Sequence, residues 1–313
     1  MTRTSWALIS GASTGIGRAT ALRLAGQGFQ VLAGVRSQSA ADSLSGEGAK
    51  LTSPSSTPGR LIPVMLDVTD ASSISAAIGR AGELAGSSGL RVVINNAGIV
   101  VPGPVEYVTA ADWRRQFDVN FFGMIELTRA ALPLLRQGVA NHGSFVPRLL
   151  FISSIGGRVS QPILAPYTTS KFATSALGDS LRLELRRQGI GVTVIEPGAI
   201  STEIWGKGDV ASEQFHPHHP ARVLYGPEID GLMKAAKRTS ARAIPADAAA
   251  KAIVRSVLAK RPPARVLVGR DAKIAAKLRN LLPLSWFDAI LMREFNISSL
   301  PVTKPDAAES KPA

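Results

Sequence analysis

Cysteine is absent from all 313 residues of this chain. Disulfide bonds, thiolate-ligated metals and cysteine nucleophiles are therefore excluded, and the composition suits a reducing compartment. The chain also lacks an uninterrupted apolar run of about 18 residues, so the sequence predicts no transmembrane helix. The first residues run directly into a strand-like segment, without a charged and then apolar leader, so we expect no secretion signal and a cytoplasmic protein.

Acidic residues are scarce relative to basic ones. The formal net charge is +13, and residues 231–280 hold 13 Lys and Arg against only Asp247 and Asp271. Such a stretch can attract phosphate, anionic lipid or nucleic acid, or it can form solvated helical faces. Apolar residues recur through it at helical spacing, which favours ordinary packing with the basic residues outside. No nucleic-acid recognition motif accompanies the charge, so we expect no nucleic-acid partner.

Short apolar segments alternate with helix-like segments along most of the chain. Strands that are apolar on consecutive residues are expected at residues 6–10, 29–35, 61–68, 90–98, 148–154, 189–198 and 264–269. Helices are expected at residues 15–28, 70–86, 112–137, 167–188 and 246–260. This order predicts the α/β class, with a doubly wound parallel sheet of the Rossmann type, covered on both faces and connected by right-handed crossovers.

Hydrophobic residues make up 45% of the chain, enough for one large core. We expect a single domain over residues 1–270, a helical extension at 271–300 and a disordered tail at 301–313.

Three segments interrupt the alternation of strands and helices. Residues 37–60 are rich in Ser, Gly and Pro and predict a mobile loop, and residues 138–147 form an insertion before the fifth strand. Residues 199–245 form a long connection, of a kind that often serves as a lid or binding loop. We expect this connection to build much of the substrate site.

A glycine-rich turn, SGASTGIG, lies between the first strand and the first helix. Gly11, Gly15 and Gly17 allow a tight turn and close approach of the backbone to a ligand. The free N–H groups and positive dipole end of the next helix suit a pyrophosphate. The spacing differs from G-x-G-x-x-G, and no P-loop lysine follows. In its strand–turn–helix context, the segment predicts dinucleotide binding, the alternative being a turn that merely tolerates glycine.

Arg36 lies 19 residues beyond Gly17, at the end of the second strand. In dinucleotide-binding folds an acid near this place binds the ribose hydroxyls of NAD, whereas an Arg accommodates the additional phosphate of NADP. No acid occurs in the segment GVRS, so we expect NADP(H) to be preferred and NAD(H) to be possible. The alternative is that Arg36 is a solvated loop cation.

Tyr167 and Lys171 are four residues apart in a segment that reads as a helix, so they share one face. A free phenol has a pKa of about 10, and an adjacent cation lowers it. A tuned tyrosine near the hydroxyl of Ser154 suits proton exchange with an alcohol or a carbonyl compound.

These residues together resemble the short-chain dehydrogenase/reductase family, from Ser5 to about Gly269. Ser154 precedes Tyr167 by 13 residues, which is the family's interval, and NNAG at 95–98 and VNFFG at 119–123 are similar to family motifs. The resemblance implies four catalytic residues: Asn120, Ser154, Tyr167 and Lys171. It also implies cofactor contacts at Gly11, Ser13, Thr14, Gly15, Ile16, Gly17, Arg36, Asp67, Asn96, Ala97, Gly98, Tyr167, Lys171, Pro197, Gly198 and Thr202.

In the mechanism that the resemblance implies, Tyr167 exchanges a proton with the substrate oxygen, and Ser154 hydrogen-bonds that oxygen. Lys171 lowers the pKa of Tyr167 and binds the nicotinamide ribose, while Asn120 holds a water in a proton path to Lys171. Ser153 is a competing candidate for the serine role.

Several of these residues also have structural interpretations. Asp67 could cap the turn before the next helix, Asn96 could support neighbouring strands, and Asn120 could be an inert helix residue. The HPHHP segment contains His216, His218 and His219. No acidic or Cys partner lies near them in the sequence, and prolines interrupt them, which favours a flexible loop over a metal site.

The substrate is expected to be a small lipophilic alcohol or carbonyl compound. The long connection contains the apolar and aromatic residues Ile200, Ile204, Trp205, Val223, Leu224 and Tyr225. The chain as a whole is similar to the retinol and hydroxysteroid dehydrogenase branch of the family. The resemblance implies a homodimer or homotetramer. The C-terminal segment from Lys277 to Phe295 could lie on an anionic membrane, pack over the pocket or contact a partner subunit, and membrane contact is not favoured.

Two other functions share this fold. A non-catalytic NAD(P)-binding sensor or scaffold would be expected to lose Ser, Tyr or Lys, and all three are present. Epimerase or dehydratase chemistry is disfavoured by the short chain after the sixth strand and by the GASTGIG turn.

Overall fold

The computed structural model describes residues 4–50, 58–141, 145–202, 216–295 and 297. Its centre is a parallel sheet of seven strands in the order β3-β2-β1-β4-β5-β6-β9. The strands are β1 (Ser5–Ile9), β2 (Phe29–Val35), β3 (Arg60–Met65), β4 (Val92–Asn95), β5 (Arg148–Ile152), β6 (Gly191–Pro197) and β9 (Arg265–Val268). All seven predicted strands are present, and the doubly wound α/β fold is confirmed.

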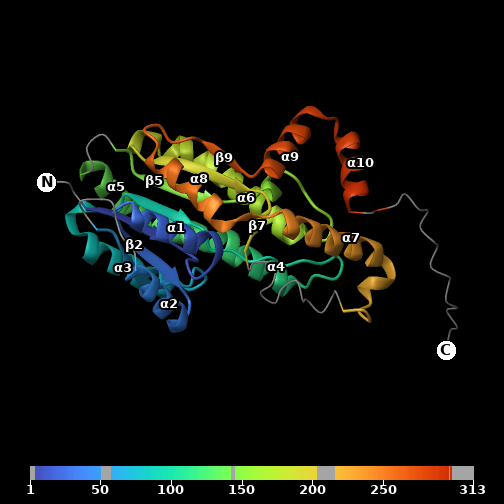
Figure 1. Cartoon of the computed structure of the whole chain (residues 1–313), viewed down its shortest axis with the longest axis horizontal. Coiled ribbons are helices and arrows are strands. Elements are labelled where there is room, and N and C mark those ends of the chain that lie inside the picture. The colour runs from blue at the N-terminus through green and yellow to red at the C-terminus, as the bar shows by residue number, and fades with distance from the viewer. Residues whose placement is uncertain (1–3, 51–57, 142–144, 203–215, 296, 298–313) are drawn as a thin grey trace.

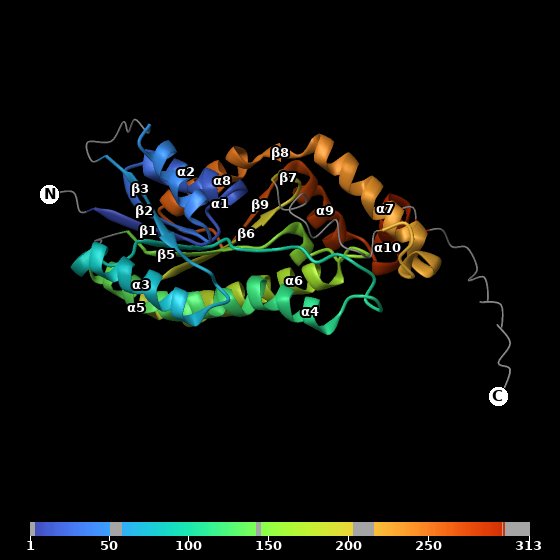
Figure 2. The ribbon, with the colours of Figure 1, turned by 90° about the horizontal axis from the view of Figure 1, so that it is seen from below.

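Helices cover both faces of the sheet, as Figure 2 shows. One layer contains α1 (Gly15–Gly26), α2 (Gln38–Gly48) and α8 (Ala246–Leu258), and the other contains α3 (Ala71–Ala85), α4 (Ala110–Phe117), α5 (Gly123–Asn141) and α6 (Ala165–Glu184). The remaining helices are α7 (Ala221–Arg242), α9 (Arg270–Leu281) and α10 (Leu284–Glu294), which lie beyond one end of the sheet in Figure 1. The predicted C-terminal helical extension is therefore present.

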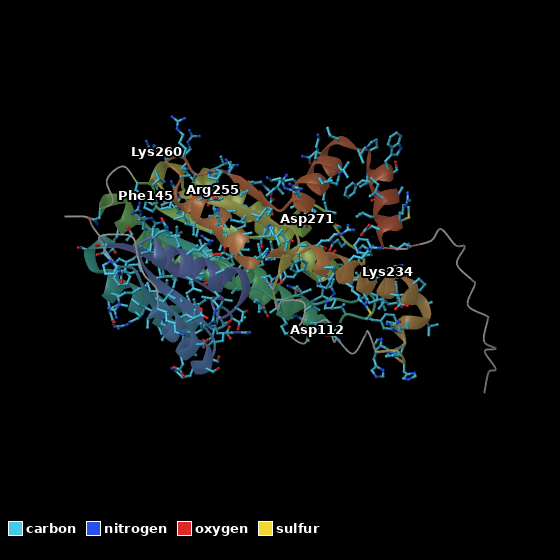
Figure 3. The ribbon with its side chains drawn as sticks, in the orientation of Figure 1. Asp112, Phe145, Lys234, Arg255, Lys260 and Asp271 are labelled. Atoms are coloured by element: carbon cyan, nitrogen blue, oxygen red, sulfur yellow. The ribbon has the colours of Figure 1, made fainter. Side chains whose placement is uncertain are left out.

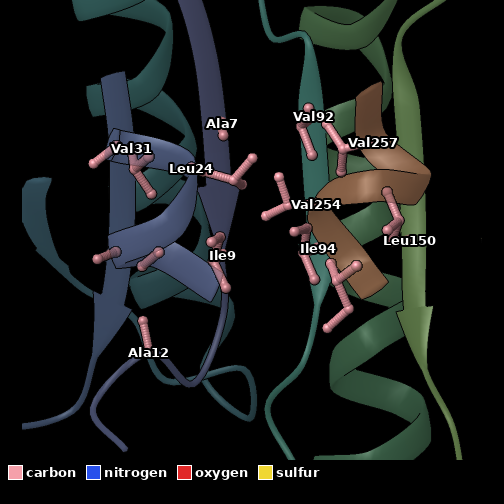
Figure 4. Close-up of a cluster of buried hydrophobic side chains, with 14 of the residues drawn as sticks. Ala7, Ile9, Ala12, Leu24, Val31, Val92, Ile94, Leu150, Val254 and Val257 are labelled. Atoms are coloured by element: carbon pink, nitrogen blue, oxygen red, sulfur yellow. The ribbon is translucent and has the colours of Figure 1, made fainter. Parts of the chain in front are cut away.

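Both faces of the sheet are buried because the strands are apolar on consecutive residues. On the first face, Leu24 of α1 faces β1 and β2, and Val254 and Val257 of α8 face β4 and β5 (Figure 4). Leu24 and Val257 are fully buried, so each contributes about 1.5–3 kcal/mol to the free energy of folding. This packing fixes the helices over the strands whose ends carry the site.

The prediction of a mobile loop over residues 37–60 was wrong at its start, because α2 occupies Gln38–Gly48. The Ser37 hydroxyl caps this helix by accepting a hydrogen bond from the backbone N–H of Ala40. Ala41 and Leu44 are buried against the core. The Ser and Gly residues of this segment concealed the helical spacing of Ala41 and Leu44. Residues 51–57 of the predicted loop lie outside the described part of the chain.

The other two interruptions also contain helical structure. The segment at 138–147 begins inside α5, which continues to Asn141. The long connection 199–245 contains α7 and a small two-stranded parallel pair, β7 (Ile200–Ser201) and β8 (Ile244–Pro245). Ile204 and Trp205, predicted to line the pocket, lie among residues 203–215, outside the described part.

The single long helix predicted at 112–137 is divided into α4 and α5 by a π-helical turn at Asp118–Phe122. Asn120 lies in this turn and is fully buried. π-helical turns are rare in proteins overall, and those that occur are often found at functional sites. Within the described residues, no helix is both long enough and apolar enough to cross a membrane.

Candidate active site

The predicted site residues follow the ends of neighbouring parallel strands. Gly11 follows β1, Asn96 follows β4, Ser154 follows β5 and Gly198 follows β6. Because the strands are parallel, these ends lie at the same edge of the sheet, where ligands bind in open α/β folds. The topology therefore brings together residues that are up to 187 positions apart in the chain.

The glycine turn has a shape that only glycine accommodates. Gly11 and Gly15 have φ values of +66° and +56°. A Cβ atom at Gly17 would lie 2.2 Å from the carbonyl oxygen of Gly11. The turn leads into α1, which has no acidic residue in its first turn and no side-chain cap from Thr14. Its amino end can therefore accept a phosphate group, so the residues present fit a dinucleotide.

Asn96 holds the glycine turn against the sheet. Its Nδ2 atom donates to the carbonyl oxygens of Ser10 at 3.0 Å and Gly11 at 2.9 Å. The Ser10 hydroxyl in turn accepts from the N–H groups of Asn96 and Ala97. These contacts match the structural interpretation of Asn96, which shapes the turn through its side-chain amide.

Asp67 and Arg36 lie at the ends of β3 and β2. Asp67 caps the turn before α3, as its structural interpretation predicted, because its Oδ1 atom accepts hydrogen bonds from the N–H and the hydroxyl of Thr69. The helix α3 itself is capped by Asp70, which accepts from the N–H of Ser72 at 2.8 Å. Arg36 is exposed, and no hydrogen bond or ion pair joins it to the described residues, so its guanidinium is available to an anion.

Tyr167, Lys171 and Ser154 come together at the ends of β5 and α6. Ser154 and the Tyr167 ring flank Gly156, since a Cβ atom there would lie 3.4 Å from Oγ of Ser154 and from Cε1 of Tyr167. The Ser154 hydroxyl accepts from the N–H of Gly156 at 3.0 Å. The Nζ atom of Lys171 lies 5.8 Å from the centre of the Tyr167 ring. The predicted i, i+4 pairing on one helix face thus occurs in the structure.

Burial dominates the ionisation of this pair. It raises the pKa of Tyr167, and the hydrogen bond from Ser154 only partly opposes that rise. It lowers the pKa of Lys171 from 10.5 to about 8. The sequence led us to expect Lys171 to lower the pKa of Tyr167, and in this structure the shift has the opposite sign because desolvation disfavours the phenolate.

Ser153, the competing serine, is committed elsewhere. Its hydroxyl donates to the carbonyl oxygen of Lys171 at 3.0 Å and lies 2.9 Å from the hydroxyl of Ser175. Both partners belong to α6, so Ser153 fastens that helix to β5. The geometry favours Ser154 for contact with a substrate.

Asn120 connects the site to the segment after β4. Its Oδ1 atom accepts from the N–H of Ile99 at 2.8 Å, and its Nδ2 atom donates to the Ser170 hydroxyl at 3.1 Å. A Cβ atom at Gly98 would lie 3.3 Å from Oδ1 of Asn120 and 3.7 Å from Nζ of Lys171. Asn120 is therefore an integral part of this cluster rather than an inert helix residue.

Thr202 and Gly198 complete the predicted cofactor residues. The N–H of Gly198 donates to the carbonyl oxygen of Val268 at 2.8 Å, which places the turn after Pro197 beside the end of β9. The methyl group of Thr202 would lie 3.0 Å from a Cβ at Gly15. Thr202 therefore lies next to the glycine turn at Gly15. Ser13 and Ile16, two further predicted cofactor residues, belong to the same turn and the start of α1.

A mostly apolar cavity of about 90 Å³ lies between α7 and the turn after β6. Leu164, which packs with Tyr167, also lines the cavity. Ala199 and Ile200 contribute from the turn after β6, and α7 contributes Leu232 and Ala235. The helix α7 was not predicted from the sequence, although Ile229, Leu232 and Ala235 recur at helical spacing in it.

Phe295, directly after α10, also lines this cavity. The C-terminal extension thus reaches the cavity, which agrees with the expectation that it could pack over the pocket. The end of α9 and the start of α10 are exposed, with Leu281, Leu284 and Trp286 each more than half accessible.

The HPHHP segment shows no metal site. The ring of His219 accepts from the N–H of Ala221 at 3.1 Å and packs against Tyr107. Within the described residues, no group of His, Asp and Glu could hold a metal ion.

Comparison with known proteins agrees with this arrangement. The family model of short chain dehydrogenases matches residues 5–211. The chain is 32% identical to an NADPH-dependent 3-dehydrocapnine reductase from Ornithobacterium rhinotracheale, over 92% of this chain and 96% of that protein. It is 32% identical to human 17-beta-hydroxysteroid dehydrogenase type 2, over 92% and 73% of the two chains.

A solved structure shows the same fold. The short-chain dehydrogenase from Streptomyces avermitilis superimposes with a TM-score of 0.72, at 27% identity, covering 94% of this chain and 97% of that one. With the strand order, the glycine turn and the Ser–Tyr–Lys cluster in place, these matches establish that the chain belongs to the short-chain dehydrogenase family.

Proposed function

We propose that this oxidoreductase interconverts a lipophilic secondary or primary alcohol and its carbonyl compound, with NADP(H) preferred and NAD(H) possible. The observation that carries the proposal is the grouping of Ser154 and Tyr167 around Gly156, with the ammonium of Lys171 5.8 Å from the centre of the Tyr167 ring. This cluster lies at the ligand-binding edge of the sheet, and Leu164, which belongs to the same buried cluster as Tyr167, lines an apolar cavity.

The bound nicotinamide would supply or accept the hydride, which no protein side chain can do. Tyr167 holds the proton at its phenolic oxygen, because burial keeps its pKa above the ordinary value. Ser154, oriented by Gly156, presents its hydroxyl next to that oxygen. A carbonyl oxygen placed between the two side chains would accept both hydrogen bonds, and Tyr167 would donate its proton during reduction.

Two observations support NADP(H). Arg36 presents an exposed guanidinium, with no ion-pair partner in the part of the chain that the structure describes, at the end of β2, where the additional phosphate of NADP is accommodated in such folds. The relative from Ornithobacterium rhinotracheale is named as NADPH-dependent. Lys171, buried without a carboxylate partner among the described residues, would bind the nicotinamide ribose.

The cavity supports a lipophilic substrate. Its lining is mainly Leu, Ile, Ala and Phe side chains, and its polar members are Gln161, Thr239 and Ser240. The described lining carries no charged side chain that would favour a carboxylate or a phosphorylated substrate. The human relative is named for its action on hydroxysteroids, which are apolar alcohols.

A homodimer or homotetramer is part of the proposal. Leu183 and Phe172 on α6 and Phe122 in the π-helical turn are large apolar side chains that remain at least 40% exposed. Burial of such residues against a second copy would be favourable. Sedimentation at several protein concentrations tests this point.

A spectrophotometric screen tests the function directly. Lipophilic alcohols and ketones are offered with NADP(H) and NAD(H), and the absorbance of the reduced nicotinamide is followed. We expect turnover that is faster with NADP(H) and with apolar substrates. Cofactor binding without turnover of any of these compounds would instead support a non-catalytic sensor on the same fold.

A further inference from the structure

Asp271 connects the C-terminal extension to the turn that follows β6. It is the second residue of α9, and its position among the outer helices is labelled in Figure 3. Its Oδ2 atom accepts a hydrogen bond from the backbone N–H of Ala199 at 2.6 Å. Asp271 and Ala199 are 72 residues apart, so the bond ties two distant segments together.

The carboxylate packs directly against two glycines. A Cβ atom at Gly198 would lie 2.1 Å from Oδ2 of Asp271, and one at Gly269 would lie 2.4 Å from Oδ1. Any side chain at Gly198 would therefore displace the carboxylate. Gly269 has a φ of +103°, a conformation that favours glycine and that leads the chain from β9 into α9.

Other bonds hold the same turn at its remaining backbone groups. The N–H of Gly198 donates to Val268, and the carbonyl oxygen of Ala199 accepts from the N–H of Ile244 at 3.1 Å. Ile200 and Ser201 then form β7, which pairs with β8. The carboxylate of Asp271 accepts the hydrogen bond from the N–H of Ala199. The turn is thus held by hydrogen bonds to β9, β8 and α9.

We propose that Asp271 is a positioning residue for the nicotinamide half of the cofactor, acting through the turn at residues 197–202. The inference rests on the proposed function, and on the family resemblance, which implies that Pro197, Gly198 and Thr202 hold the nicotinamide amide. Loss of the Asp271 carboxylate frees the N–H of Ala199 and loosens Gly198. Thr202, which lies against the glycine turn at Gly15, shifts with it.

A purely structural role makes a different prediction. Asp271 lies in the first turn of α9, where any negative side chain stabilises the helix through its dipole. Asp271→Glu keeps that charge but cannot keep its carboxylate against Gly198. Asp271→Asn loses the charge but keeps the oxygen that accepts from Ala199. The two variants therefore separate positioning from helix stabilisation.

The experiment measures binding by calorimetry, with NADPH as one ligand and 2′,5′-ADP, the adenosine half alone, as the other. For Asp271→Ala and Asp271→Glu we expect NADPH to bind about tenfold more weakly, the size of one lost hydrogen bond. Binding of 2′,5′-ADP is expected to stay at the wild-type value, and Asp271→Asn is expected to bind NADPH nearly as wild type. Asp288→Ala, which removes an exposed carboxylate of α10, is the matched control.

Equal weakening of both ligands, unchanged NADPH binding, or full binding by Asp271→Glu would each overturn the proposal. If Asp271→Ala does not fold, the Glu and Asn variants still decide the question. The binding experiment requires no substrate. Absence of turnover would therefore count against the proposed function alone, and the binding data would still decide the role of Asp271.

Discussion

The ammonium of Lys171 donates a hydrogen bond of 2.8 Å to the carbonyl oxygen of Ile152, the last residue of β5. Lys171 is only 4% exposed, and among the described residues no carboxylate compensates its charge. A buried ammonium with one neutral partner is costly, and its pKa falls to about 8. The protein thus carries a cation in a position that a bound anionic or polyhydroxyl ligand would stabilise.

This cost predicts a pH dependence of stability. The unfolded state has a Lys pKa of about 10.4, above the folded value, so the unfolded state binds more protons between these two values. The free energy of unfolding contributed by Lys171 therefore rises with pH in that window. We expect wild type to gain about 1 kcal/mol relative to Lys171→Met between pH 7 and pH 9, measured by urea unfolding without cofactor. A constant difference across that range would contradict the buried, depressed Lys171.

The two adjacent serines predict separable effects. Ser154→Ala removes the hydroxyl next to the phenol of Tyr167, and we expect kcat to fall about a hundredfold while stability changes little. Ser153→Ala breaks the bonds to Lys171 and Ser175, and we expect about 1–2 kcal/mol of lost stability with a far smaller change in kcat. Kinetics and thermal unfolding on both variants check this pair. The reverse pattern would move the catalytic role to Ser153.

Two glycines of α1 provide a matched test of the cofactor turn. A Cβ at Gly17 would collide with the Gly11 carbonyl oxygen, whereas nothing lies within 4 Å of a Cβ at Gly26. Gly17→Ala is expected to weaken NADPH binding about tenfold or more, the equivalent of about 1–3 kcal/mol of overpacking. Gly26→Ala is expected to bind NADPH as wild type. Calorimetric titration measures both, and equal affinities would refute the tight turn.

Arg36 is expected to set the choice of cofactor. Arg36→Asp replaces a phosphate-binding cation with an acid, and we expect the ratio of kcat/KM for NADP over NAD to fall about tenfold to a hundredfold. Arg80→Asp on α3 makes the same change in net charge at an exposed site and serves as control. An unchanged ratio in the Arg36 variant would show that another group binds the phosphate.

The strand–helix alternation and the glycine turn were predictable because they depend on local patterns. Parallel pairing places Gly11, Asn96, Ser154 and Gly198 at one edge of the sheet, so their proximity was foreseeable, whereas the strand order came from the structure alone. The helix α2 was not, because only Ala41 and Leu44 mark its buried face within a Ser- and Gly-rich segment. The shift in the pKa of Tyr167 was predicted with the wrong sign, because spacing shows the neighbour Lys171 but not the depth of burial.

Contacts between distant segments escaped the sequence analysis altogether. Asp271 and Ala199 meet only because β9 pairs with β6, and the sequence carries no pattern that joins them. Phe295 reaches the cavity because the C-terminal helices turn back toward α7. Such contacts depend on tertiary packing, which residue type and spacing do not reveal.

The kinetics of Tyr167→Phe decide whether this phenol is the catalytic acid and base. The change removes one oxygen, keeps the ring among its apolar neighbours and takes away the proton that the phenol would transfer. We expect kcat to fall about 10²- to 10⁴-fold, with the dissociation constant of NADPH unchanged. Near-normal turnover in this variant, with the same substrate and cofactor, would contradict the assignment of Tyr167 as the acid and base.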